Sequence, residues 1–396
     1  MNEGKATRYH RQRRRARLVA TLGGVALLLA VLLSGGTVAL RDGLRAWLTE
    51  TPQSGGPLPW FAPACYAGVV WILVEVWLFP FRFYWQVILE RRYRVSETPA
   101  LSWLVTTLTT SWLNVALVAI AAVVVSMTRL WWPEVWWLAC GALFSAATLV
   151  ATTLAPVWIL PRVSTIRPLK RPSLEDRLAS LAARIGVPPI RVDELVLGRG
   201  RRGAHASLVG LGTSRRVLLS DTLLSDYSDA EIEAVTAHEM GHHVHRDLWQ
   251  TASYELGLAF VALWTAGWVV TAIGAWFGVT GPTDLAALPL LALVGGGVVA
   301  MATPLGHALS RYHERRADHF ALRYCSEPAA LASSLRRLGE QHLAEERPSR
   351  AVELFWHSHP PLERRLAQLS RDAVARVSRT SPAGRRSPAY PAAPSG

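Results

Sequence analysis

Long apolar stretches alternate with shorter polar segments along most of the 396-residue chain. A mainly apolar stretch of about 18 or more residues is long enough to cross a bilayer as a helix. The pattern predicts six such spans, at residues 18–40, 61–81, 103–127, 135–158, 254–278 and 285–309. The sequence therefore predicts a mainly α-helical, polytopic membrane protein, with four spans in a membrane domain at residues 18–160 and two more at residues 254–309.

The composition agrees with a membrane protein. Hydrophobic residues make up 51% of the chain, tryptophan occurs 17 times, and the mean hydropathy is +0.20. These values are those of neither a disordered chain nor an ordinary soluble domain. Aromatic residues that fit a belt at the outer membrane surface are Trp131, Trp132, Trp136 and Trp137. The three cysteines are scattered, and we expect neither a disulfide framework nor a cysteine zinc site.

Basic residues set the expected orientation, because Lys and Arg concentrate on the cytoplasmic side of membrane spans. They crowd the N-terminal residues 1–17 and the segment 90–94 that follows the second predicted span. Six spans then place both termini on the cytoplasmic side. A net charge of +13 would suggest nucleic acid in a soluble chain, but here membrane lipids are the expected partner and nucleic acid is not. Residues 18–36 also fit a signal peptide, whose cleavage would leave the orientation of the later spans unchanged.

Two polar segments, residues 161–253 and 310–377, are predicted to form the halves of one cytoplasmic domain that the last two spans divide. The pattern predicts a helix from Ser173 that ends at Gly186 and a later helix near residues 327–346. Short strands are predicted at residues 190–196, 206–211 and 216–220, with a turn around Gly210 and Gly212. The tail at residues 378–396 lacks apolar periodicity and should be disordered.

The segment His238-Glu239-Met240-Gly241-His242 carries the chemistry that the sequence indicates most clearly. Positions i and i+4 share one face of a helix, so both imidazoles can bind a single metal ion. Glu239 then lies beside that metal, where a carboxylate can take a proton from a zinc-bound water and pass it to a leaving amine. A capping box from Ser228 to Glu231 predicts that this helix begins near residue 229.

A catalytic zinc site usually needs a third protein ligand, with water in the fourth position. Glu314 and Asp318 lie four residues apart on one predicted helical face, so Glu314 could coordinate the metal while Asp318 fixes a ligand imidazole. Spacing alone also allows an ordinary charged helix, with Glu314 paired to a neighbouring arginine. His245, one turn beyond His242, is a rival ligand that we rank below Glu314, since three ligands on one helix complete a tetrahedron poorly.

Three motifs in this order around a pair of spans carry a family resemblance: HEMGHH at 238–243, SRYHERRAD at 310–318 and SHPPLERR at 358–365. The chain resembles the type I CAAX prenyl proteases and their bacterial HtpX-like relatives, which are integral-membrane zinc metalloendopeptidases. The resemblance covers roughly residues 155–370, and residues 204–224 add a further family-like segment. It implies a split, gluzincin-like zinc protease domain with a small β-sheet on the cytoplasmic side of about six membrane helices.

The resemblance also implies a role for each site residue. His238, His242 and Glu314 would bind one Zn²⁺ per chain, Glu239 would act as general base and acid, and Asp318 would orient a ligand. His359 would steady the oxyanion, with Arg365 nearby. The strand that contains His205 and Ala206 would pair with an extended substrate backbone. Many relatives carry Asn where this chain has His205, which leaves that backbone contact open.

The expected function is hydrolysis of peptide bonds in membrane-associated or misfolded proteins at the cytoplasmic face of the membrane, by Glu-assisted attack of zinc-bound water. Two alternatives keep the same fold: a protease for prenylated CAAX proteins and a catalytically silent scaffold. A transporter would need ionisable residues along a path inside the spans, and Glu75, with Asn114, is the main candidate. The sequence does not indicate the oligomeric state.

Overall fold

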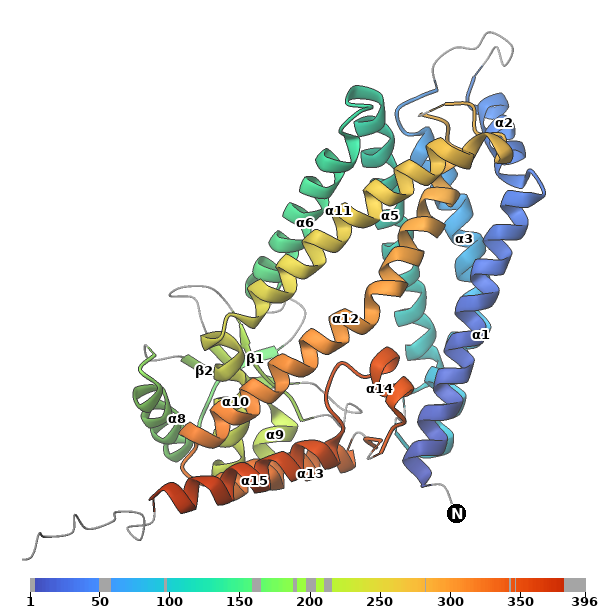
Figure 1. Cartoon of the computed structure of the whole chain (residues 1–396). Coiled ribbons are helices and arrows are strands. Elements are labelled where there is room, and N and C mark those ends of the chain that lie inside the picture. Colours follow the sequence, from blue (N-terminus) through green and yellow to red (C-terminus); the bar gives the residue numbers. More distant parts are fainter. Residues whose placement is uncertain are drawn as a thin grey trace, which may run out of the picture.

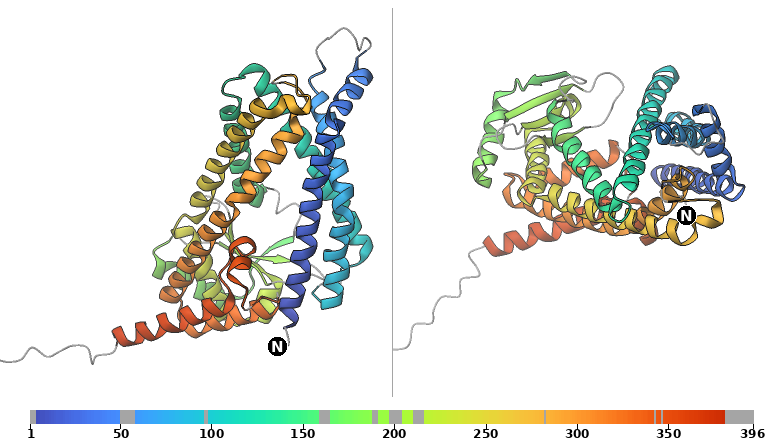
Figure 2. Two further views of the ribbon diagram at one scale, coloured as in Figure 1. Left: turned by 45° about the vertical axis from the view of Figure 1, so that its right-hand side comes forward. Right: turned by 90° about the horizontal axis from the view of Figure 1, so that it is seen from above.

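The computed structural model describes residues 4–49, 58–95, 98–158, 165–187, 191–196, 204–209, 216–281, 283–341, 343–345 and 347–380. Long helices form a bundle at one end of the molecule, and a small sheet with shorter helices lies at the other (Figure 1). The N-terminal end of the first helix lies toward the end that holds the sheet, and two further views agree (Figure 2).

The bundle is built from two parts of the chain. The first comprises α1 (Lys5–Leu33), α2 (Gly36–Leu48), α3 (Ala62–Phe83), the π-helical turn η1 (Tyr84–Ile88), α4 (Leu89–Tyr93), α5 (Ala100–Trp131) and α6 (Trp136–Trp158). The second comprises α11 (Asp247–Ile273), the 3-10 turn η3 (Gly274–Phe277) and α12 (Ala287–Tyr324). Helix α11 packs against α6 and α12, and so joins the two parts.

Within the described residues, five apolar helices are long enough to cross a membrane: α1, the continuous rod from α3 to α4, α5, α11 with η3, and α12. The apolar part of α6 among these residues, Trp136–Thr152, is shorter. Helices therefore lie over all six predicted spans, and the chain is a multi-pass membrane protein.

The first predicted span, at residues 18–40, extends past the end of its helix. Helix α1 begins at Lys5 because its arginine-rich start has a good helix propensity and extends the helix beyond the apolar stretch. It ends at Leu33, and the chain then turns at Gly35, whose φ of 76° suits glycine. The apolar residues after this turn belong to α2, which a hydropathy pattern cannot separate from α1.

Helix α12 joins the membrane part to the soluble domain without a break. It contains 38 residues, with Pro304 inside it, so the boundary predicted at residues 309 and 310 falls within a continuous helix. The last span and the segment with Glu314 are therefore one structural element.

The sheet has the strand order β1-β2-β4-β3, with β1 at Thr165–Pro168, β2 at Arg191–Val196, β3 at Ala206–Val209 and β4 at Arg216–Ser220. Strands β2 and β4 are parallel, whereas β1 and β3 pair antiparallel to their neighbours. The three predicted strands are confirmed where the chain is described, and the predicted turn at Gly210 and Gly212 lies outside the described residues. Strand β1 was not predicted, because it is short and mainly exposed.

Shorter helices surround the sheet and complete the soluble domain. They are α8 (Pro172–Ile185), α9 (Asp221–Asp226), α10 (Asp229–Val244), α13 (Pro328–Gln341), α14 (Arg350–Trp356) and α15 (Leu362–Thr380). Leu174, Leu178 and Leu181 share one face of α8 and are buried in the core with residues from α10 and β4. The predicted helix that ends at Gly186 is confirmed. The helix α15 includes residues 378–380 of the predicted tail, and residues 381–396 lie outside the described chain.

Candidate metal centre

Helix α10 begins with a capping box that fixes the position of the HEMGH segment. Ser228 Oγ accepts a hydrogen bond from the Glu231 backbone N at 3.3 Å, and Glu231 Oε2 accepts one from Ser228 N at 2.9 Å. Ile232 and Met240 are buried in the core and hold the two halves of the helix in place. The predicted helix start is confirmed.

Gly241 allows α10 and α12 to approach each other closely. A Cβ at this position would lie 3.2 Å from both Ala317 Cα and Phe320 Cβ, so a larger residue would push the two helices apart. The close crossing brings the face of α10 that carries His238 and His242 against α12.

Three side chains from these two helices converge on one point. His238 Nε2 lies 3.2 Å from His242 Nε2 and 3.6 Å from Glu314 Oε2. His242 Nε2 lies 3.5 Å from Glu314 Oε1. One possible ligand atom from each residue lies within 4.8 Å of the others. Among the described residues, these three side chains form a group that could hold a metal ion.

The remaining ring nitrogen of each histidine faces an aspartate. His238 Nδ1 lies 3.0 Å from Asp318 Oδ1, and His242 Nδ1 donates to Asp247 Oδ2 at 2.8 Å. Carboxylates in these positions fix the imidazole tautomer and leave both Nε2 lone pairs directed at the common point. Asp318 therefore lies beside His238, one of the two candidate ligand histidines.

Asp247 is the site residue that the sequence analysis missed. On a continuous helix, a residue five positions after His242 would lie on a different face. The chain instead turns at Arg246, whose φ of 58° is left-handed, and Asp247 starts α11 within reach of the His242 ring. Arg316 of α12 donates to the same carboxylate and links the three helices. The sequence does show an aspartate just after the motif. That residue could be linked to His242 only once the turn at Arg246 was known.

The donor set fits a tetrahedral zinc ion. Two imidazole nitrogens and one carboxylate oxygen are ligands that zinc prefers, and bonds of about 2.0 Å put neighbouring ligand atoms about 3.3 Å apart in a tetrahedron. The separations of 3.2, 3.5 and 3.6 Å in this cluster are close to that value. His238, His242 and Glu314 could therefore hold one metal ion with a fourth position left open.

A cavity of about 260 Å³ lies over the cluster, and we call it the metal-site cavity. Strand β3, at the edge of the sheet, forms one wall with His205 and Ala206. Ser220 of β4 fixes this edge, because its backbone N donates to His205 O and its Oγ accepts from His205 N, both at 2.9 Å. Glu239 from α10 and His359 from the segment before α15 form other parts of the wall.

Two family models match consecutive parts of the chain. The CAAX prenyl protease N-terminal model, described with five membrane helices, matches residues 4–165, and the model of peptidase family M48 matches residues 168–373. The chain belongs to peptidase family M48. M48 is a family of metalloproteases, which agrees with the His-His-Glu cluster. The first family model counts one membrane helix more than the four spans predicted for this region.

Curated relatives of this M48 chain are known from bacteria and eukaryotes. An uncharacterized metalloprotease, YhfN, of Bacillus subtilis is 29% identical over 232 residues, which cover 56% of this chain and 53% of that protein. CAAX prenyl protease 1 of Saccharomyces cerevisiae is 37% identical over 97 residues, 24% of this chain and 21% of that protein. Protease HtpX homolog 1 of Streptomyces coelicolor is 31% identical over 222 residues, 50% of this chain and 68% of that protein.

The matched region covers only about half, or less, of the length of YhfN and of the yeast CAAX prenyl proteases. A solved structure, Ste24p of S. mikatae, aligns with a TM-score of 0.73 and 20% identity. The alignment covers 92% of this chain and 87% of that one, so the two share a fold.

Glu239, the acidic residue of the HEMGH segment, is not among the three residues that could hold a metal ion. Burial raises the pKa of Glu239, and the neighbouring imidazoles of His238 and His242 oppose this rise. Burial alone would lower the pKa of His242, but hydrogen bonds to Glu314 and Asp247 outweigh it and raise that pKa to about 9. A metal ion must therefore displace a proton from His242 when it binds.

His359 and Arg365 both lie at the cluster, as the sequence motif suggests. His359 Nδ1 is 3.0 Å from Glu314 Oε1, and its side chain is 64% exposed toward the cavities. Arg365 donates to both oxygens of Asp318, at 2.7 and 2.6 Å, and its Nη1 lies 3.3 Å from Glu314 Oε2. Arg365 is thus placed to hold two carboxylates in position.

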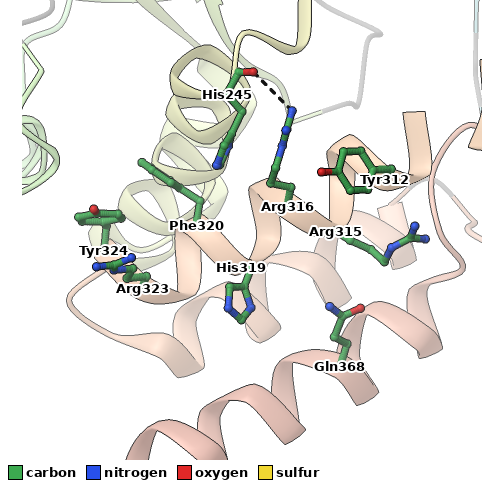
Figure 3. A pocket seen from close by; sticks show the side chains of 9 residues that line it. All are labelled: His245, Tyr312, Arg315, Arg316, His319, Phe320, Arg323, Tyr324 and Gln368. Atoms are coloured by element: carbon green, nitrogen blue, oxygen red, sulfur yellow. Dashed lines mark hydrogen bonds between the residues drawn. The ribbon is translucent and has the colours of Figure 1, made fainter. Parts of the chain in front are cut away.

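His245, the rival ligand, points away from the cluster. Its Nδ1 lies 2.7 Å from Gly241 O, and its ring packs against Phe320 at a centroid distance of 5.4 Å. Figure 3 shows this side chain in a separate groove of about 530 Å³ on the opposite face of α12, among exposed basic residues such as Arg323. The ranking of Glu314 above His245 agrees with this geometry.

Glu75, the main candidate for a transport path, is engaged in an ion pair. Arg82 donates to its two carboxylate oxygens at 2.5 and 3.1 Å, and Ser111 Oγ donates at 2.7 Å. All three residues come from the neighbouring helices α3 and α5. The ion pair lies within α3, and the hydrogen bond from Ser111 links it to α5. A carboxylate neutralised in this way does not favour a transporter.

Proposed function

We propose that this protein is a zinc metalloendopeptidase that hydrolyses peptide bonds of membrane-associated or misfolded proteins at the cytoplasmic face of the membrane. The observation that carries the proposal is the convergence of His238, His242 and Glu314 beside Glu239, in one cavity bordered by a sheet edge. One zinc ion per chain, when bound, supplies a Lewis acid that lowers the pKa of water.

The protein groups then have separate tasks. Glu239 accepts a proton from the attacking water and returns it to the leaving amine, and its raised pKa makes the first of these transfers easier. His359, at the wall of the cavity, donates a hydrogen bond to the oxyanion of the tetrahedral intermediate. Arg365 acts through Asp318 and Glu314, whose positions it fixes. Asp318 and Asp247 keep the ligand histidines in the metal-binding tautomer.

Strand β3 is proposed to bind the substrate backbone. It is the terminal strand of the sheet order, it pairs with β4 on one side, and it borders the cavity with Ala206. An extended peptide added to this edge would pass across the cluster and present a peptide carbonyl to it. Backbone pairing of this kind tolerates many side chains, which suits a protease with varied protein substrates.

The cytoplasmic location is proposed from charge. The basic N-terminal end of α1 lies toward the end of the molecule that carries the soluble domain (Figure 1). Basic residues that flank spans favour the cytoplasmic side, so the metal centre is assigned to that side as well. Trp131 and Trp132, which are 64% and 49% exposed, lie at the corner between α5 and α6 and suit the outer interface. Trp77 donates to Ala20 O at 2.9 Å, which supports a retained α1 rather than a cleaved signal peptide.

Prenylated CAAX proteins are the second candidate substrate, because relatives of this chain bear the name CAAX prenyl protease 1. The two substrate classes differ in one requirement. A protease for prenylated proteins would cleave a farnesylated CAAX peptide much faster than the same peptide without the lipid. A protease for misfolded membrane proteins would cleave casein or unfolded membrane proteins without any lipid.

The direct test measures zinc content and cleavage of casein, an unfolded membrane protein and paired CAAX peptides by the detergent-purified protein. Glu314→Ala should lose zinc and all cleavage, because it removes one of three ligands. The matched control is Glu340→Gln, an exposed glutamate on α13, which should keep both. A wild-type protein that binds zinc and cleaves none of these substrates would support the silent scaffold instead, and a protein without zinc would refute the proposal.

A further inference from the structure

A second cavity, of about 670 Å³, adjoins the metal-site cavity. The two share four lining residues, which are Leu335, Leu338, His359 and Arg365. A volume of this size is in the range of pockets that bind small ligands or parts of a peptide, roughly 300–1,000 Å³. Because His359 and Arg365 belong to both walls, a chain that lies across the metal centre can extend into the second cavity.

One wall of this second cavity is the N-terminal end of α1. His10, Arg13, Arg14 and Arg17 line it, and their spacing of three, four and seven residues places them on one helical face. We call this space the arginine cavity. The membrane-spanning helix thus contributes a row of cations to the surroundings of the metal centre.

The wall is held firmly against the soluble domain. His10 Nε2 donates to Leu343 O at 2.8 Å, and Leu343 has a φ of 48°, which leucine rarely adopts. Arg14 donates to Glu345, with Nη2 to Oε1 at 3.2 Å, and Glu345 Oε2 also lies 3.5 Å from His357 Nε2. These contacts fix α1 beside the segment that carries His359.

Two arginines of this wall form no direct ion pair with a carboxylate of the described chain, although Glu90 lies near enough to interact electrostatically with both. Arg14 is paired with Glu345, but within the described chain no carboxylate lies within 4.0 Å of Arg13 or Arg17. Arg13 Nη1 donates only to Tyr9 Oη at 3.3 Å, and its buried Nε has no hydrogen-bond partner among the described residues. Arg17 lies over the Trp85 ring at 5.8 Å. Half-buried guanidinium groups that are not hydrogen-bonded to a carboxylate have donors left for an anionic ligand.

Arg15 lies on a different face of α1 from Arg13 and Arg17 and has different surroundings. It is exposed and lines a different, mainly apolar depression of about 450 Å³ with Val19 and Phe81. Lipid headgroups that attract basic flanks explain a side chain in that position. They do not explain cations that line a space sharing wall residues with the metal-site cavity.

We propose that Arg13 and Arg17 form an anion subsite that binds a carboxylate of the peptide substrate, either its C-terminus or an acidic side chain near the scissile bond. The occupant is a peptide because the arginine cavity and the metal-site cavity share walls. Guanidinium groups match the geometry of carboxylates and are always charged. The inference rests on the proposed function and adds a substrate preference to it.

The test first uses binding, so that it does not depend on catalysis. A fluorescent peptide made with a C-terminal acid or a C-terminal amide, and with Glu or Gln near the scissile bond, is titrated by anisotropy onto the full-length, zinc-loaded Glu239→Gln protein. A hydrogen-bonded charge pair predicts about tenfold tighter binding of one carboxylate form. The Arg13→Gln/Arg17→Gln double variant, made in the Glu239→Gln background, should lose this preference. Arg15→Gln in the same background, with one charge removed from the same helix, should keep it.

The same peptide pairs are then compared by kcat/KM on enzymes that retain Glu239, where the acid preference should reappear and depend on the same two arginines. Equal binding of all peptide forms, or an equal loss of preference in Arg15→Gln, would overturn the subsite. Equal peptide binding, with inhibition by phosphatidylglycerol vesicles that only the double variant relieves, would assign the cavity to lipid and also overturn it. Acid-dependent binding by a wild-type protein that cleaves nothing would instead refute the proposed function and leave the subsite standing.

Discussion

The glutamates at the two ends of α10 differ in their hydrogen-bond partners. Near its start, Glu231 and Glu233 are 6% and 0% exposed, and both are surrounded by donors. Those donors are Ser228, Ser333 and Arg337 for Glu231, and Arg177, Arg184 and Ser326 for Glu233. Near its end, Glu239 faces the metal-site cavity.

The pKa values follow this difference. Burial would raise the pKa of Glu231 and Glu233, but the hydrogen bonds of serines and arginines outweigh it and lower both. Burial raises the pKa of Glu239 because no guanidinium pairs with it directly among the described residues. The carboxylates that pair with arginines, Glu231 and Glu233, anchor α10 in its domain. Glu239 has no such partner and can exchange a proton.

The largest effect is expected from Glu239→Gln. The amide has the same shape but cannot accept the proton of water, so the cleavage rate should fall by about 10²–10⁴-fold. Zinc content and the melting temperature should stay close to those of the wild type, since Glu239 is neither a ligand nor a structural partner. Peptide cleavage, metal analysis and thermal unfolding on one preparation measure all three. A variant that loses zinc together with activity would contradict the role given to Glu239.

Glu233→Gln should have the reverse signature. It removes the charge of a buried carboxylate that accepts from Arg177 and Arg184, and because these arginines are partly exposed we expect a cost of about 1–3 kcal/mol of the free energy of unfolding. Activity per zinc-loaded molecule should change little. Glu327→Gln is the matched control, because this 61%-exposed partner of Arg177 should contribute at most about 1 kcal/mol. A stable but inactive Glu233→Gln protein would remove the distinction between the two ends of α10.

Asp318→Asn tests the orientation of the ligands. The amide keeps the size of the side chain, but the charge that faces His238 Nδ1 and holds Arg365 is lost. We expect zinc affinity to fall by about 10–100-fold, measured by competition with a chelator. Excess zinc should restore cleavage in this variant and should not restore it in Glu239→Gln. Unchanged affinity would show that Asp318 does not orient the ligand.

The pH dependence of stability should follow the N-terminal end of α10. The lowered pKa of Glu231 and Glu233 means that their ionised forms stabilise the fold above their usual value of 4.5. That stability should be lost as pH falls below about 4.5 and through the lowered pKa values. Thermal unfolding followed by circular dichroism across this range should show a steep acid limb that Glu233→Gln flattens. An acid limb that Glu239→Gln flattens equally would show that the two ends are not distinct.

Much of this site could be predicted because its signals are local. The Ser228 capping box and the spacing of His238 and His242 are properties of one helix, and the i, i+4 relation of Glu314 and Asp318 belongs to another. That the two helices contribute to one metal site was implied by a family resemblance and not by spacing, and their close approach at Gly241 was not predicted.

The features that the sequence did not predict depend on backbone turns and distant contacts. Asp247 reaches His242 only because Arg246 turns the chain, and Arg13 faces the second cavity only because α1 docks on the loop at Leu343. The turn at Gly35 separates two helices of similar hydropathy, so an apolar pattern joined them. All three features depend on a single φ angle or on a tertiary contact. Neither a φ angle nor a tertiary contact produces a periodic pattern in the sequence.

The unbroken course of α12 has a mechanical consequence. Its 38 residues form a rod about 57 Å long, with one end among lipids and Glu314 toward the other. Spanning helices change their tilt when bilayer thickness changes, and a rod of this length works as a lever that carries the tilt to its far end. His238 and His242 sit on α10, which is separated from the membrane helix α11 by the turn at Arg246. We therefore expect a change in bilayer thickness to move Glu314 and the two histidines by different amounts, and so to alter the distances within this cluster.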